Sequence, residues 1–277
     1  FKTYLPLFVV ALVFLDLWPE TRQIPSYFHW KLAFLDVYIN TMKHISEYIQ
    51  PHTIWLFIIA IGFSINPYYS YLHAQTNPDD VQIARIKYRG GGDWYNDPSS
   101  LTNLLRFTAE RVPLGLSTRY RDVDLGSTDL FQYPFVFLTG HGTIATNASE
   151  RRNLRRYLEQ GGFLYVDDDY GLDASFRALI AETFPEEELI ELPFAHPVFN
   201  QVFTFPTGVP KIHEHDNQAP RTFGLFLEGR LVLVYPFEST LADGWADPAI
   251  HNTPEDKRTQ ALRMGANILV YALSAAP

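Results

Sequence analysis

Three consecutive aspartates follow a short apolar run in the stretch GGFLYVDDDYG: Asp167, Asp168 and Asp169. Carboxylates bind hard divalent cations, and neighbouring acids can supply two or three oxygen ligands. An imidazole nearby would add affinity for Zn2+ or Mn2+. The segment KIHEHD provides His213 and His215. One expectation is therefore a divalent metal bound by Asp168, His213 and His215, although no HExxH motif or comparable spacing is present.

The same aspartates also have a structural interpretation. In it, Asp167 accepts hydrogen bonds from loop amides, Asp168 faces solvent, and Asp169 caps the following helix together with Asp173. A third interpretation is a pocket for a small ligand or peptide. In that pocket Asp168, His215 and His141, the last from the motif TGHG, would make polar contacts with the ligand without catalysis.

Aromatic residues in two glycine- and aspartate-rich segments are further candidates: Trp94 and Tyr95 in DWYN, and Trp245 in ADGW. Their rings suit carbohydrate or peptide faces as well as packing of a loop against a sheet. The preceding glycines, residues 90–92, lack the spacing of a phosphate loop and predict a tight turn or a close backbone approach. The complete set of ligand-binding candidates is Asp93, Trp94, His141, Asp167, Asp168, Asp169, Tyr170, His215 and Trp245.

Several chemistries are excluded by composition. The chain has no cysteine, which rules out thiol nucleophiles, disulfides and thiolate metal sites. No GxSxG motif occurs, and Ser175 falls within a predicted helix. The charges of residues 1–74 cancel, so the net charge of −9 belongs to the rest of the chain. An acidic domain is a poor partner for phosphates, and we expect no nucleic acid and no cofactor apart from the metal.

Strands and helices are expected to alternate along the chain. Residues 81–88, 135–138 and 163–166 have strand patterns. Helices should follow them, starting at Ser99 or Ser100, at Asn147 or Ser149, and at Asp173. Farther on we expect an edge strand at 188–192, a hairpin of residues 223–227 and 231–235, and a final helix from about Pro254. Such alternation predicts a mainly parallel sheet covered on both faces, with TGHG and DDDYG at the carboxyl ends of strands, where ligands gather.

Two longer segments carry a resemblance. The residues YPFVFLTGHG and YLEQGGFLYVDDDYG resemble the core of class I glutamine amidotransferase-like domains, including the trehalose-utilisation-like branch. Together with KYRGGGDWYNDPSSLTNLLRF and EGRLVLVYPFESTLADGW, they are similar to an uncharacterised bacterial domain-of-unknown-function family, usually exported or membrane-anchored. The resemblance covers residues 81–274 and implies a three-layer, flavodoxin-like α/β fold. Where that superfamily carries its cysteine, this chain has aspartates, so glutamine hydrolysis through a thiolate is excluded.

The N-terminal part contains two apolar segments, residues 4–18 and 54–65. From Met42 the chain has the order of a secretory signal, with Ala74 as the small residue before a cleavage point. Residues 53–72 are uncharged and also suit a membrane anchor, and a buried helix of a soluble domain is the third option. We expect a hydrophobic segment at 1–41 that need not belong to the mature protein, a signal peptide or anchor at 42–75, and the amidotransferase-like domain at 76–277.

These observations give three hypotheses for function. The first is an exported, non-catalytic domain that binds a ligand or partner. The second is a metal-assisted hydrolase that uses Asp167, Asp168 and Asp169 with His141 and His215. The third is a structural subunit of a membrane assembly. All three place the domain in the periplasm or outside the cell, with the membrane as a partner through the N-terminal segment and protein partners at the envelope.

Overall fold

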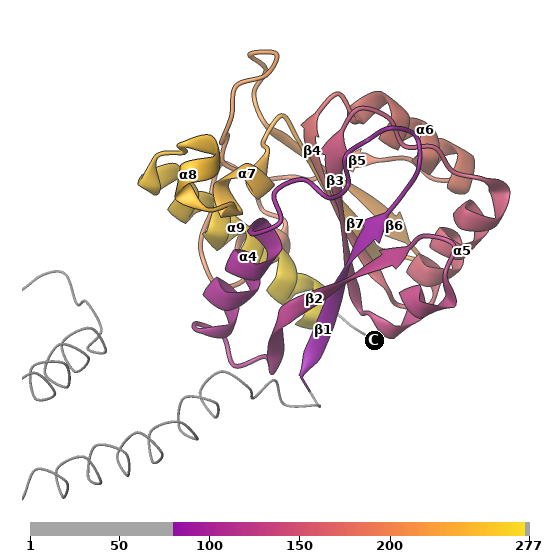
Figure 1. The fold of residues 1–277 in the computed structure, drawn as a ribbon, viewed down its shortest axis with the longest axis horizontal. Helices are drawn as coiled ribbons and strands as arrows, with labels where there is room; N and C mark the ends of the chain where they lie inside the picture. The colour runs from indigo at the N-terminus through magenta and orange to yellow at the C-terminus, as the bar shows by residue number, and fades with distance from the viewer. Residues whose placement is uncertain (1–79, 275–277) are drawn as a thin grey trace, which may run out of the picture. The chain divides into compact units, whose positions relative to one another are not determined.

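The computed structural model describes residues 80–274, in which strands and helices alternate (Figure 1). The segments 1–41 and 42–75 lie outside the described residues. The helices are α4 (Ser100–Ala109), α5 (Ala148–Glu159), α6 (Asp173–Thr183), α7 (Leu241–Trp245), α8 (Pro248–His251) and α9 (Glu255–Ser274), with 3-10 turns η1 (Thr128–Gln132) and η2 (Pro197–Phe199).

One seven-stranded sheet organises the described residues. Its strands are β1 (Val81–Lys87), β2 (Leu116–Asp124), β3 (Phe135–His141), β4 (Phe163–Tyr170), β5 (Ile190–Glu191), β6 (Arg221–Leu227) and β7 (Arg230–Phe237). They lie in the order β2-β1-β3-β4-β7-β6-β5. The first five positions are parallel, whereas β6 pairs antiparallel with β7 and with β5. The mainly parallel sheet, the late hairpin and the edge strand are therefore confirmed.

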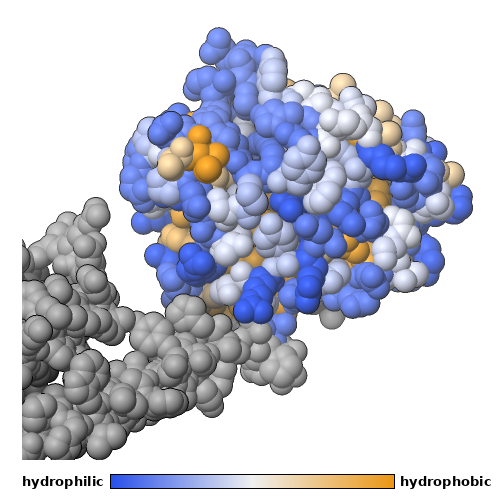
Figure 2. All heavy atoms as spheres, in the orientation of Figure 1, coloured by the Kyte–Doolittle hydropathy of each residue, from blue (hydrophilic) through white to orange (hydrophobic). Residues whose placement is uncertain are grey.

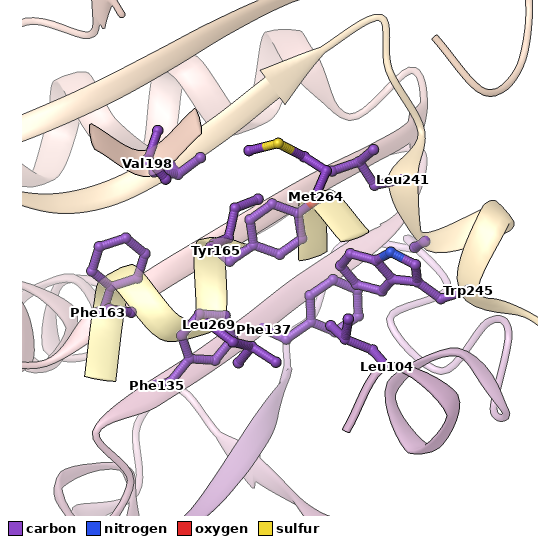
Figure 3. Close-up of a cluster of buried hydrophobic side chains, with 14 of the residues drawn as sticks. Leu104, Phe135, Phe137, Phe163, Tyr165, Val198, Leu241, Trp245, Met264 and Leu269 are labelled. Atoms are coloured by element: carbon purple, nitrogen blue, oxygen red, sulfur yellow. The ribbon is translucent and has the colours of Figure 1, made fainter. Parts of the chain in front are cut away.

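Helices cover the two faces of this sheet (Figure 1). On one face α4, α7 and α9 bury a layer rich in aromatic rings, part of which Figure 3 shows. Within it Phe137 stacks on Tyr165 with ring centroids 5.7 Å apart, and Tyr165 lies 5.5 Å from Trp245. On the other face α5 and α6 pack on aliphatic residues such as Leu164 and Val166. Because side chains alternate along a strand, consecutive residues of β4 enter different layers.

Two features of the sheet differ from the sequence-based expectation. Strand β2 was not predicted; it is an edge strand with the sequence LSTRYRDVD, and charged residues are common where one edge faces solvent. Strand β4 was predicted to end at Val166 but continues to Tyr170. Its pairing with β3 includes Thr139 with Asp167 and Gly140 with Asp168. This pairing overrides the poor strand propensity of aspartate.

The glycine turn after β1 is a close backbone approach, as predicted. A Cβ atom on Gly90 would lie 2.5 Å from the backbone nitrogen of Ala145 and 2.6 Å from the carbonyl oxygen of Thr143. Gly90 also has a φ of 120°, which side-chain-bearing residues rarely adopt. The turn therefore requires glycine to bring the loop after β1 against the loop after β3.

Helix α5 begins at a capping box that allows a first prediction. Asn147 Oδ1 accepts hydrogen bonds from the amides of Ser149 and Glu150, and Glu150 Oε2 accepts one from the amide of Asn147. Asn147 is thus the cap, and not Ser149. We expect Asn147→Ala to lower the free energy of unfolding by about 1 kcal/mol, measured by urea denaturation. Ser149→Ala is the control, and an equal loss there would contradict the assignment of the cap.

Candidate functional site

The three consecutive aspartates are the fifth to seventh residues of β4, and the strand's alternation separates them. Asp167 points toward the aromatic layer and is fully buried. Its carboxylate accepts hydrogen bonds from the amides of Leu241, at 3.2 Å, and Ala242, at 2.8 Å. Tyr165 Oη donates a third bond of 2.5 Å. The expectation that Asp167 binds loop amides is confirmed, with the amides at the start of α7.

Asp168 lies on the opposite face of β4. The expectation that it faces solvent is wrong, because only 7% of the residue is exposed. Its Oδ1 accepts a bond of 2.9 Å from the amide of Leu172, and its Oδ2 accepts one of 3.1 Å from Tyr235 Oη. Asp173, the first residue of α6, lies 2.8 Å from the same tyrosine hydroxyl, whose single proton the two carboxylates share. Asp168 therefore stabilises the connection between β4 and α6.

Asp169 returns to the face of Asp167 and has no such support. Its side chain is 1% exposed, and neither carboxylate oxygen has a hydrogen-bond partner among residues 80–274. The expectation that Asp169 caps α6 is wrong, since neither of its oxygens accepts a hydrogen bond from that helix. The imidazole of His141 places Nδ1 3.9 Å from Oδ2 of Asp169. The buried hydroxyl of Thr139, next to Asp167 across the β3–β4 pair, is also without a partner in this region.

Two further aspartates lie close to Asp169. Asp97 comes from the loop between β1 and α4, and Asp243 from α7. One carboxylate oxygen from each of the three lies within 4.8 Å of the others, a spacing that suits a shared metal ion. We call Asp97, Asp169 and Asp243 the carboxylate triad. Its members come from segments far apart in the chain, and meet because β1, β4 and β7 end at the same edge of the sheet.

Two histidines complete the surroundings of the triad. His213, in the loop before β6, contacts Asp243 Oδ2 through Nδ1. His251, the last residue of α8, places Nε2 2.8 Å from both oxygens of Asp97 and 3.7 Å from Asp243 Oδ1. The donor atoms of His213, Asp243 and His251 also lie within 4.8 Å of one another. We call these three residues the histidine subsite.

The carboxylate triad and the histidine subsite together form one cluster of five residues: Asp97, Asp169, His213, Asp243 and His251. Burial and mutual repulsion control the protonation of this cluster. Burial raises the pKa of Asp169 well above its usual range, and the neighbouring charge of Asp243 raises it further. Burial likewise raises the pKa of Asp243 to about 7. Burial lowers the pKa of His213, with a further contribution from Lys257, and this favours the neutral imidazole. Carboxylates that resist ionising next to one another would ionise readily around a divalent cation.

His141 and Asp93 lie beside the triad. Asp93 Oδ1 accepts a hydrogen bond of 2.6 Å from the amide of His141, and its Oδ2 lies 3.1 Å from Nδ1 of the imidazole. The side chain of His141 is 54% exposed, so the imidazole is oriented by Asp93 yet open to solvent. Trp94, which follows Asp93 in the chain, is half-buried. The guanidinium carbon of Arg85 lies over its ring, 5.3 Å from the ring centroid.

Of the predicted metal ligands, His213 belongs to the cluster, whereas Asp168 and His215 do not. His215 lies in a loop and not in a strand, and Nε2 forms a hydrogen bond of 2.6 Å with Thr240 Oγ1. Its ring stacks on exposed Tyr170, with centroids 4.9 Å apart. Trp245, placed in a loop by the sequence analysis, lies in α7 and is buried in the aromatic layer, where Nε1 donates to the carbonyl of Ala261.

Three residues of the cluster were not among the sequence candidates: Asp97, Asp243 and His251. Asp97 directly follows the segment DWYN and Asp243 lies in ADGW, the two segments whose aromatic residues were candidates. Both segments follow predicted strands, so an acid after each strand was the signal that could have found them. His251 lies on a four-residue helix and has no comparable signal.

The comparisons with known proteins give a family but no activity. Residues 82–273 match a family model described as a domain of unknown function (DUF4159). The comparison with curated proteins finds no match. Within residues 80–274, none of the helices is both long and apolar enough to cross a bilayer.

Proposed function

The chain belongs to the DUF4159 family of domains of unknown function, and we propose that its domain binds a divalent cation in the carboxylate triad for metal-assisted hydrolysis. One observation carries the proposal: Asp169 is buried, and neither of its oxygens accepts a hydrogen bond from an N–H or O–H donor in the described part of the chain. Burying a charged carboxylate without a partner costs several kcal/mol. A cation held with Asp97 and Asp243 would provide the missing partner.

The chemistry of the triad favours a hard ion. Three carboxylates and no sulfur suit Mg2+ or Mn2+. Such an ion acts as a Lewis acid and lowers the pKa of a bound water. His141, oriented by Asp93 and 3.9 Å from Asp169, lies where it can contact a ligand of that ion. The triad, His141 and Asp93 would therefore supply the protein groups for hydrolysis once an ion and its water are bound.

Ligand binding without turnover is the second candidate, and one observation favours it. Tyr170, the last residue of β4, is exposed and stacks on His215, which lies two residues after His213 of the histidine subsite. A pair of stacked rings offers a flat surface to a sugar or a peptide side chain. In this case the cation would fix the ligand without activating water.

The test is metal binding by the full chain after removal of bound metal. We expect calorimetric titration with Mn2+ to show saturable binding that is weakened roughly 100-fold or more in Asp169→Asn, because a charged ligand is lost. Asp168→Asn is the matched control. It changes the adjacent buried aspartate, which faces away from the triad, and should keep the ion. Circular dichroism checks that both variants are folded.

Turnover is measured on the same samples with p-nitrophenyl phosphate, bis(p-nitrophenyl) phosphate and p-nitrophenyl acetate. Mn2+-dependent hydrolysis that is lost in Asp169→Asn but kept in Asp168→Asn supports the enzyme. Binding without hydrolysis favours the second candidate. If the wild-type chain binds no ion, or if both variants lose the ion equally, the proposal is wrong.

We further propose the cellular setting and the fold family. The strand order β2-β1-β3-β4-β7 follows the flavodoxin-type order with β7 in the fifth position, and this supports an amidotransferase-like fold. The apolar segments 4–18 and 54–65 support export or membrane anchoring to a periplasmic or extracytoplasmic location, with protein partners at the envelope. The face in Figure 2 carries scattered apolar residues among hydrophilic ones, which gives the structural-subunit hypothesis no support on that side.

A further inference from the structure

We propose that the histidine subsite, formed by His213, Asp243 and His251, holds a second divalent cation, with Asp243 bridging the two ions. The inference rests on the proposed function only for the first ion, in the carboxylate triad. Asp243 is the member shared by the two donor sets. A carboxylate that bridges two neighbouring ions is a common arrangement in hydrolytic two-metal sites, where each ion stabilises one of the reacting oxygens.

The spacing of the donor atoms supports a second ion. Ligands bound about 2.0–2.1 Å from one ion lie roughly 3 Å apart when they are adjacent in the coordination sphere. His251 Nε2 lies 2.8 Å from the oxygens of Asp97 and 3.7 Å from Asp243 Oδ1. His213 Nδ1 contacts the other oxygen of Asp243, Oδ2. Each oxygen of Asp243 therefore lies near a different imidazole.

The orientation of the two imidazoles agrees with this spacing. Their ring centroids are 5.4 Å apart and their planes are inclined by 71°. The rings are therefore not stacked on each other, and each presents a nitrogen to the same carboxylate. One His–Asp ion pair is a common structural contact, but it needs only one imidazole. Two imidazoles and a second acid, Asp97, around one buried carboxylate form a coordination set.

The two positions differ in the metal that they should prefer. The carboxylate triad offers oxygen donors alone, which suit Mg2+. The histidine subsite adds two imidazole nitrogens, which suit Zn2+. The side chains of His213 and His251 are 31% and 26% exposed, so an ion can reach them from solvent and their replacement leaves the core intact. The subsite should therefore take up Zn2+ when Mg2+ occupies the triad.

The experiment titrates the full, metal-free chain with Zn2+ in excess Mg2+, and separately with Mn2+ followed by electron paramagnetic resonance. We expect one Zn2+ and two Mn2+ per chain, with a spin-coupled spectrum from the Mn2+ pair. His213→Ala and His251→Ala should each weaken Zn2+ binding roughly 100-fold and leave one Mn2+ with the hyperfine lines of an isolated ion. His215→Ala is the control, because His215 belongs to neither donor set and forms a hydrogen bond with Thr240 instead. This variant should bind both metals as the wild type does.

The outcomes separate this inference from the proposed function. If the wild-type chain binds one Mn2+ that is lost in Asp169→Asn and kept in both histidine variants, the triad holds an ion and the second site is wrong. If Zn2+ binding survives in His213→Ala and His251→Ala, or falls equally in His215→Ala, the inference is also overturned. Both sites are supported independently if Asp169→Asn loses Mg2+ binding but still binds Zn2+, while the two histidine variants no longer bind Zn2+.

Discussion

Asp169→Asn is expected to make the metal-free protein more stable at about pH 8, by about 1–3 kcal/mol. Substitutions of buried residues usually destabilise. Here the wild-type carboxylate accepts no hydrogen bond from an N–H or O–H donor within residues 80–274, and burial together with the charge of Asp243 raises its pKa, so ionising it costs free energy. Asparagine has nearly the same shape and no charge, so it removes the repulsion. The same change should abolish cation binding at the proposed site, and stability and cation binding would then change in opposite directions.

Asp169 and Asp243 contribute to the pH dependence of stability, together with Asp167, whose pKa burial raises to about 6. In the unfolded chain an aspartate has a pKa of about 3.9. In the fold the pKa of Asp243 is raised to about 7, and that of Asp169 is raised well above its usual range. Because the folded values are the higher ones, the protonated carboxyls contribute stability below about pH 4. That contribution is lost as the pH rises through the folded pKa, at about 7 for Asp243.

The measurement is urea denaturation of metal-free protein at several pH values between about 5 and 8. This range includes the folded pKa of Asp243, at about 7. The free energy of unfolding of the wild type should fall across this range, and it should fall less in Asp169→Asn. Asp168→Asn is the control and should be less stable than wild type at every pH, because it weakens bonds to Leu172 and Tyr235. Equal destabilisation by both variants at the highest pH would refute the account of Asp169.

Asp167→Ala should lower the free energy of unfolding by about 3–5 kcal/mol. It would leave three buried donors without their acceptor: the amides of Leu241 and Ala242 and the hydroxyl of Tyr165. Each unsatisfied buried donor costs about 1–3 kcal/mol. The two amides belong to the start of α7, which carries Asp243, so cation binding should weaken as well. Asp167 thus acts on the site by positioning α7.

Differential scanning calorimetry checks this prediction, with an expected decrease in Tm of roughly 10 °C. Asp167→Asn is the control, because its amide oxygen can still accept a bond from one of the two amides, and a smaller loss than in Asp167→Ala is expected there. A positioning role also predicts that Asp167→Asn keeps the cation with nearly unchanged affinity. A loss of cation binding in Asp167→Asn without a loss of stability would instead make Asp167 a ligand.

Much of the architecture could be predicted because its signals are local. The apolar runs at β1, β3 and β4 and the glycines that follow them indicate strands and turns without reference to distant residues. Strand β2 could not be predicted in the same way, since its charged residues are tolerated only because it lies at the edge of the sheet. The continuation of β4 through Asp167 to Asp169 depends on pairing with β3, which is again non-local.

The site was predicted only in part, for the same physical reason. The sequence indicated the aspartates of β4 and His213, but it grouped Asp168 with them. Once β4 is known to continue, alternation alone separates Asp168 from Asp167 and Asp169. Asp97, Asp243 and His251 approach Asp169 through loops and short helices whose positions depend on the whole sheet. The hydrophobic periodicity of a strand or a helix carries no information about such contacts between distant segments.

The wide separation of the cluster's residues along the chain also bears on how the protein is made. Asp97 is the first of them and His251 the last, so the cluster has high contact order and closes long loops. During synthesis the strands that carry the early residues emerge well before α7 and α8. A nascent chain that ends before Asp243 lacks the carboxylate that the carboxylate triad and the histidine subsite share. Cation uptake should therefore follow release of nearly the whole domain from the ribosome, and it would stabilise only chains that have completed folding.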